Sequence, residues 1–191
     1  MRHPVRVLHV LNGASGGAAE STIELARQLT TLGVTNFALC QQPRDPELAQ
    51  AFSLHFDGPV QFAKLYSWNR RTRTTALFRP AAAGLQLVRT KAALASARVA
   101  MKAIAQWNVD LVHTNTFLTP EGAIAARSLG LPHIWHVREL FGPGRPFRVR
   151  GEGSRMTNAL ATSDIVANSP TTSDCFRAVF PGKEVTLIPN G

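Results

Sequence analysis

The sequence predicts an α/β fold in which a doubly wound, mainly parallel sheet is flanked by helices. Short apolar runs alternate with longer stretches of helical periodicity along the 191 residues, and this alternation is typical of βαβ units. An apolar share of 45% and a charged share of 17% describe an ordinary globular chain and exclude a disordered or fibrous one. We therefore expect one domain over residues 1–191, long enough to bury about 70% of its unfolded surface without a disulfide or a metal.

The expected strands are short, apolar and bounded by turn residues. In chain order they lie at Val5–Leu11, Phe37–Cys40, Val60–Leu65, Asp110–Thr114, Pro132–Val137, Ile165–Ala167 and Val185–Ile188. Apolar residues at helical spacing predict a first helix that follows the Gly13–Gly17 loop, with Ile23 to Leu32 as its periodic residues. Further helices are expected at Pro43–Phe52, in a long segment ending near Trp107, and at Pro120–Leu129, Met156–Thr162 and Cys175–Val179. The segments Trp68–Arg73 and Gly142–Arg150 are expected to be irregular.

Cysteine usage and the amino terminus predict a cytoplasmic protein. Cys40 and Cys175 are far apart and have no CxxC spacing or neighbouring histidine, which indicates a reducing compartment. The apolar run Val7–Leu11 is too short for a signal peptide and contains His9, so we expect it to be the first buried strand. No apolar run approaches the 18 residues of a membrane-spanning helix.

The net charge of +9 comes from one segment. Residues 58–109 contain nine Lys and Arg and no acidic residue, whereas the rest of the chain is balanced. Lys91, Arg98 and Lys102 fall on one stripe of the expected long helix, and Arg70, Arg71 and Arg73 precede it. Such a stripe is either a solvated helix face or a contact with an anionic membrane surface, where each cation contributes about 1 kcal/mol. Nucleic acid is not expected as a partner because few aromatic residues are interleaved for base stacking.

Polar residues follow almost every expected strand, at the sheet edge where ligands of parallel α/β proteins bind. Asn12 follows the first strand, His113 and Asn115 end another, and His136 and Arg138 end a third. The first loop contains Gly16 and Gly17 and leads directly into a helix, whose amino-terminal N–H groups can bind phosphate or hydroxyl groups. The alternative for this loop is a glycine turn that serves only tight strand-to-helix packing.

Other site chemistries find little support. A dinucleotide site is excluded because the glycine loop is not GxGxxG and the second strand ends in Cys40-Gln41-Gln42, without the acidic residue that binds a ribose. A P-loop site is excluded because no GK[ST] follows the loop. His133 and His136 lie three residues apart on one strand and therefore point to opposite faces. No carboxylate pair or nucleophile motif is present at a recognisable spacing. We expect neither a metal nor a cofactor.

Five segments, in this order and spacing, resemble the amino-terminal domain of the retaining GT-B fold glycosyltransferases of family 4. They are Val7–Leu29, in which Gly16-Gly17 precedes Glu24-Leu25-Ala26, then Asp110–Asn115, Gly130–Glu139, Asp164–Ser169 and the terminal Ile188–Gly191. The resemblance covers the chain except for roughly Pro43 to Trp107. One residue departs from the pattern, because many members carry Glu two residues beyond the second glycine, where this chain has Ala19.

The resemblance implies a Rossmann-like, acceptor-side domain whose donor-binding partner domain would begin after Gly191. The substrates would be a nucleotide-sugar donor and a glycan or lipid-linked acceptor, and the chain alone would bind without turnover. His136 would be the catalytic residue that reaches sugar or acceptor hydroxyls, and Gly16 and Gly17 would stabilise the diphosphate. Arg138 would hold a phosphate of a lipid-linked acceptor, with Asn12, His113 and Asn115 as further contacts.

A second hypothesis is a non-catalytic domain that binds a glycan or a membrane surface. It would use the basic segment for attachment and would tolerate changes in the Gly16-Gly17 loop. The sequence does not predict which sugar or acceptor is bound, nor the oligomeric state.

Overall fold

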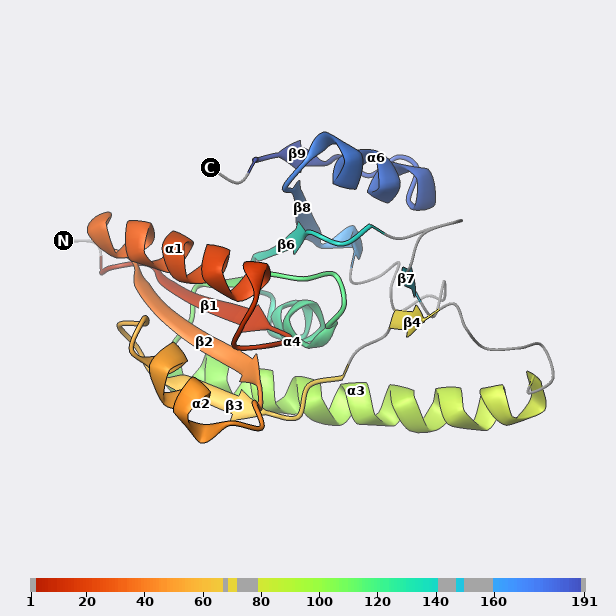
Figure 1. The fold of residues 1–191 in the computed structure, drawn as a ribbon, viewed down its shortest axis with the longest axis horizontal. Coiled ribbons are helices and arrows are strands. Elements are labelled where there is room, and N and C mark those ends of the chain that lie inside the picture. Colours follow the sequence, from red (N-terminus) through yellow and green to blue (C-terminus); the bar gives the residue numbers. More distant parts are fainter. Residues whose placement is uncertain (1–2, 67–68, 72–78, 141–146, 150–159, 190–191) are drawn as a thin grey trace.

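The computed structural model describes residues 3–66, 69–71, 79–140, 147–149 and 160–189. Its main sheet has seven strands in the order β3-β2-β1-β5-β6-β8-β9, and every neighbouring pair is parallel. The strands are β1 (Arg6–Leu11), β2 (Thr35–Gln41), β3 (Val60–Ala63), β5 (Leu111–Thr114), β6 (His133–Val137), β8 (Ser163–Ala167) and β9 (Thr186–Leu187). The doubly wound parallel sheet is therefore confirmed, with α1 on one side of β1 and β2 and α3 on the other (Figure 1).

The helices follow the expected segments. They are α1 (Gly17–Thr31), α2 (Pro46–Ser53), α3 (Arg79–Trp107), α4 (Glu121–Leu129) and α6 (Pro170–Val179). Local signals set several ends: Asp45 caps α2 by accepting a hydrogen bond from the Glu47 amide, and Gly130 ends α4 in the left-handed conformation. Most of the helix expected at Met156–Thr162 lies outside the described residues.

Two sequence expectations were wrong. Trp68–Arg73 and Gly142–Arg150 were expected to be irregular, but β4 (Asn69–Arg71) and β7 (Phe147–Val149) pair antiparallel as a small second sheet. Strands of three residues that pair with a segment far away in the sequence do not produce a local sequence pattern from which they could be predicted. Helix α6 also begins at Pro170, five residues before the expected start, because Ser169 caps it by accepting a hydrogen bond from the Thr172 amide.

The core lies on both faces of the sheet. On one face β1 and β2 pack against α3 and α4, where the rings of Phe37 and Trp107 stack at 5.4 Å. On the other face α1 and α2 bury a smaller apolar cluster that includes Leu11 and Phe52. Gly122 lets α4 approach the sheet, because a Cβ at this position would collide with Thr114 Oγ1.

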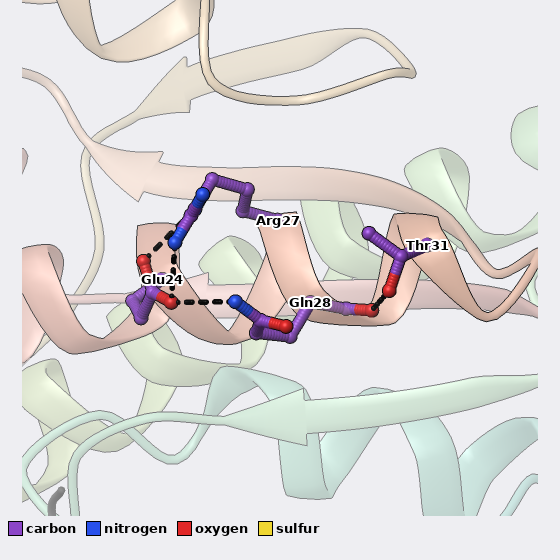
Figure 2. A network of polar contacts seen from close by, with 4 residues as sticks. All are labelled: Glu24, Arg27, Gln28 and Thr31. Atoms are coloured by element: carbon purple, nitrogen blue, oxygen red, sulfur yellow. Dashed lines mark hydrogen bonds and ion pairs between the residues drawn. The ribbon is translucent and has the colours of Figure 1, made fainter.

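The outer face of α1 is polar. The Glu24 carboxylate accepts hydrogen bonds from Arg27 and from Gln28 Nε2, and Thr31 Oγ1 donates to the Gln28 carbonyl (Figure 2). These residues are exposed, whereas Ala19, Thr22 and Ala26 are buried on the opposite side of the helix. The inner face of α1 thus fixes the helix on the sheet, and with it the position of its amino terminus.

No helix within the described ranges is long and apolar enough to cross a bilayer.

Candidate functional site

The candidate site lies at the carboxyl ends of β1, β5 and β6. From β1 the chain proceeds outward to β2 and β3 and then returns through α3 to β5 on the other side of β1. In sheets of this kind the reversal of strand order between two neighbouring strands, here β1 and β5, opens a crevice for ligands. The Asn115 amide donates to the Val10 carbonyl at 2.9 Å, so the ends of these two strands are in register at this crevice.

The glycine loop after β1 places the amino terminus of α1 at the crevice. Gly16 has a φ of 85° and a ψ of 175°, a conformation that is accessible almost only to glycine. The first intrahelical bond runs from the Glu20 amide to the Gly16 carbonyl, and no side chain caps the helix. The amides of Gly17, Ala18 and Ala19 therefore precede the helical hydrogen-bond ladder. A Cβ on Gly17 would have open space around it, and Gly16, Gly17 and Asn12 are exposed.

Asn115 links the start of α1 to the loops after β5 and β6. Its side chain is fully buried. Its Nδ2 donates to the Ala18 carbonyl at 2.7 Å and to Thr22 Oγ1, and its Oδ1 accepts from Arg138 Nε at 2.5 Å. Both ends of the amide are occupied, so Asn115 connects the start of α1 to the loops after β5 and β6.

His136 brings an unsatisfied donor to the site. Its side chain is 8% exposed, and burial, together with the charge of Arg138, lowers its pKa to about 4, so the ring is neutral at pH 7. Its Nδ1 lies 3.4 Å from Arg138 Nη2, which can only donate, so the ring proton belongs on Nε2. That buried Nε2 has no hydrogen-bond partner among the described residues. A buried N–H with no partner among the described residues is a candidate donor to a ligand atom.

Arg138 and Glu139 fix the loop after β6. Arg138 is partly buried, which lowers the pKa of its guanidinium, while the neighbouring Glu139 acts in the opposite direction. Glu139 Oε1 accepts from Thr116 Oγ1, and its Oε2 accepts from the Phe117 amide at 2.9 Å. Sequence reasoning missed Glu139, although it directly follows the His-x-Arg pattern at the end of a strand.

Two further buried histidines lie on β1 and β5. His113 is 5% exposed and His9 is fully buried, and their Nδ1 atoms are 3.0 Å apart. Burial lowers the pKa of His9 to about 4 and that of His113 well below its ordinary value. The rings of His113 and His136 lie 5.6 Å apart. His9 was missed as a site residue, and the available signal was a polar side chain inside an otherwise apolar strand.

His133 does not join this group. Its Nε2 lies 2.8 Å from Thr114 Oγ1 and its Nδ1 lies 2.7 Å from Ser163 Oγ. Among the described residues no group of three or more His, Cys, Asp or Glu side chains could hold a metal ion.

The basic residues lie on elements other than these loops. Lys91, Arg98 and Lys102 are exposed on α3 and have no ion-pair partner among the described residues. Arg70 and Arg71 belong to β4, and Arg73 lies outside the described residues.

The fold and this edge of the sheet define a GT-B type, Rossmann-like domain, and three solved structures share the fold. A glycosyltransferase from Rickettsia africae matches with a TM-score of 0.61 and 17% identity, over 100% of this chain and 44% of that one. UGT2 of Phytolacca americana, solved with UDP-2-fluoro-glucose and pterostilbene, matches with a TM-score of 0.50 and 12% identity, over 100% of this chain and 55% of that one. A UDP-N-acetylglucosamine 2-epimerase matches with a TM-score of 0.52 and 16% identity, over 96% of this chain and 44% of that one.

Residues 15–191 match the family Glycosyltransferase Family 4, and the chain belongs to this family. No curated protein matches the sequence. The chain spans about half the length of the solved structures above.

Proposed function

We propose that this chain is the acceptor-binding half of a retaining glycosyltransferase that moves a sugar from a nucleotide-sugar donor to a glycan or lipid-linked acceptor. Two donor groups on elements that Asn115 links carry the proposal. They are the amides at the start of α1 that precede its hydrogen-bond ladder, and the buried Nε2–H of His136. Membership of the glycosyltransferase family supports it.

The mechanism would be electrostatic. When the bond between sugar and diphosphate breaks, negative charge grows on the leaving oxygens. The amides after Gly16, aided by the dipole of the 15-residue α1, would stabilise these oxygens without rearranging. The Nε2–H of His136 would donate to a hydroxyl of the sugar or acceptor, and Arg138 would hold a phosphate of a lipid-linked acceptor. No metal or cofactor enters this scheme.

A transfer assay tests the proposal. A longer protein that continues past Gly191 should transfer sugar from one of a panel of UDP-, GDP- and dTDP-sugars, whereas residues 1–191 alone should not. Replacing His136 with Ala in the longer protein should lower kcat by 10- to 100-fold, since a hydrogen bond made in the transition state is lost. The exposed His55 provides the control, and His55→Ala should leave kcat unchanged. Sugar transfer by residues 1–191 alone would contradict the proposal.

A peripheral membrane contact through α3 is a second candidate function. It is favoured by the exposed cations Lys91, Arg98 and Lys102 and by the absence of any acidic residue from 58 to 109. Anionic lipid would attract this surface, and an acceptor carried on a lipid would then be held near the site.

A further inference from the structure

The orientation of the Asn36 side chain is fixed by its surroundings. Asn36 is fully buried on β2, and four oxygens lie within 3.1–3.2 Å of its Nδ2. They belong to the carbonyls of Ala26 and Val34, the hydroxyl of Thr30 and the carboxylate of Asp57. Three of the four can only accept, so a flipped amide would place Oδ1 against them. Asn36 Oδ1 therefore faces away from them, toward His9.

This orientation fixes the proton of His9. Asn36 Oδ1 lies 3.0 Å from His9 Nε2 and can only accept, so His9 Nε2 must donate. A neutral imidazole carries one ring proton, which leaves His9 Nδ1 as an acceptor. Complete burial of His9 favours this neutral form.

The same reasoning extends to His113. His9 Nδ1 lies 3.0 Å from His113 Nδ1, so His113 must donate through Nδ1. Neutral His113 then has a bare Nε2, for which no hydrogen bond to a described residue is found. His136 has the opposite tautomer, because its Nε2 carries the ring proton. This Nε2 also has no hydrogen-bond partner among the described residues.

We infer that His113 Nε2 accepts a hydrogen bond from a hydroxyl group of the bound sugar or acceptor, and that Asn36 and His9 are positioning residues that hold His113 in the required tautomer. A hydroxyl can donate to His113 and accept from His136, whose ring lies 5.6 Å away. A sulfate, carboxylate or phosphodiester oxygen carries no proton at pH 7 and can only accept, so it would be opposed by the lone pair on His113. The pair thus selects a neutral hydroxyl over an anion. This inference rests on the proposed function for the identity of the ligand, and on the hydrogen-bond chain alone for the tautomer.

Long-range proton–nitrogen NMR of the ¹⁵N-labelled chain at pH 7 tests the tautomer without any ligand. His113 should show a protonated Nδ1 and an unprotonated Nε2, and His9 should show the reverse. Replacing His9 with Phe should return His113 to the Nε2–H form preferred by a free imidazole. The matched control is His133→Phe, which removes another buried histidine with polar partners of its own and should leave His113 unchanged. A His113 protonated on Nε2 in the unmodified chain would overturn the inference.

Titration with glucose, and separately with inorganic sulfate, which carries no hydroxyl proton at pH 7, tests the ligand class. Glucose should move the Nε2 resonances of both His113 and His136, whereas sulfate should leave His113 Nε2 in place. A larger response of His113 to sulfate, or no response to glucose, would overturn the assignment of a hydroxyl. The two experiments distinguish failure of this inference from failure of the proposed function. Absence of sugar transfer by the longer protein would contradict the proposed function, whereas the NMR measurement of the His113 tautomer does not depend on sugar transfer.

Discussion

Gly16 and Gly17 are adjacent, but a side chain would have different effects at the two positions. Gly16 has a positive φ with extended ψ, and a residue other than glycine there costs about 1–3 kcal/mol. Gly17 lies at the first helical position with open space around its missing Cβ. We predict that Gly16→Ala lowers the melting temperature, whereas Gly17→Ala leaves it unchanged or raises it slightly. Thermal unfolding of the two variants measures this difference.

A bulkier side chain at Gly17 separates the two explanations of the loop. If the loop binds a ligand, Gly17→Val should weaken binding of the nucleotide sugar to the longer protein while its fold is retained. If the loop serves packing only, Gly17→Val should bind as the unmodified protein does. Unchanged binding would favour the non-catalytic alternative.

The buried histidines predict a loss of stability in acid. Burial lowers the pKa of His9 and His136 to about 4 and that of His133 to about 3, whereas an unfolded histidine titrates near 6.5. Between these values the unfolded chain binds more protons than the folded one, so stability falls as the pH falls. At pH 5 each of these histidines should reduce the free energy of unfolding by about 2 kcal/mol relative to pH 7. Glu121 acts in the opposite direction, because burial raises the pKa of its carboxyl.

Urea unfolding at pH 7 and pH 5 measures this effect. The decrease in stability between the two pH values should be smaller in His9→Phe than in the unmodified chain, because one buried histidine is removed. His55→Gln, at an exposed position, should leave the decrease unchanged. Equal pH dependence in His9→Phe and the unmodified chain would contradict the burial of a neutral His9.

Among the elements, α4 depends on close contact with the sheet. A Cβ at Gly122 would collide with Thr114 Oγ1 and lie within 3.2–3.3 Å of Val10 and Val112. Gly122→Ala should therefore destabilise the chain by about 1–3 kcal/mol, as overpacking of a core does. Gly13→Ala, where the nearest atom lies 4.0 Å away, is the control and should cost much less. Equal melting temperatures for the two variants would contradict the packing of α4 on β5.

The exposed stripe of α3 predicts binding to anionic vesicles. Replacing Lys91, Arg98 and Lys102 with Gln removes three cations, which should weaken binding to phosphatidylglycerol vesicles by roughly 100-fold at about 1 kcal/mol each. Co-sedimentation measures the affinity, with phosphatidylcholine vesicles and Arg27→Gln, on the exposed face of α1, as controls. Two results would show that the stripe is only a solvated helix face. One is equal binding of the unmodified chain to both lipids, and the other is equal binding of the triple variant and the unmodified chain to phosphatidylglycerol.

The sequence predicts elements whose cause is local and misses those whose cause is distant. The parallel strands are apolar runs, and Gly33 and Gly130 mark helix ends, so these elements could be read directly. The β4–β7 pairing could not, because neither segment carries an alternating pattern. The site divides in the same way. His136 at the end of β6 and Gly16-Gly17 after β1 could be found from the strand pattern. The contacts that fix His113 and the loop after β6, from Asn36 to His9 and from Glu139 to Thr116, are formed only by the fold.

At the scale of the whole molecule, two kinds of donor at the carboxyl ends of the strands have no partner among the described residues: the first amides of α1 and Nε2 of His136. The chain spans about half the length of the solved structures that share its fold. Under the proposed function these donors form only part of the site for the nucleotide sugar, so we expect tight binding to require a longer protein.

Calorimetric titration with nucleotide diphosphate sugars measures whether residues 1–191 alone bind the sugar donor. Residues 1–191 and a longer protein that continues past Gly191 would be titrated with the same UDP-, GDP- and dTDP-sugars. We predict that only the longer protein binds one of them tightly, with the affinity lowered by Gly17→Val. Tight binding to residues 1–191 alone would contradict the account, and would mean that the Gly16-Gly17 loop belongs to a complete nucleotide site within this domain.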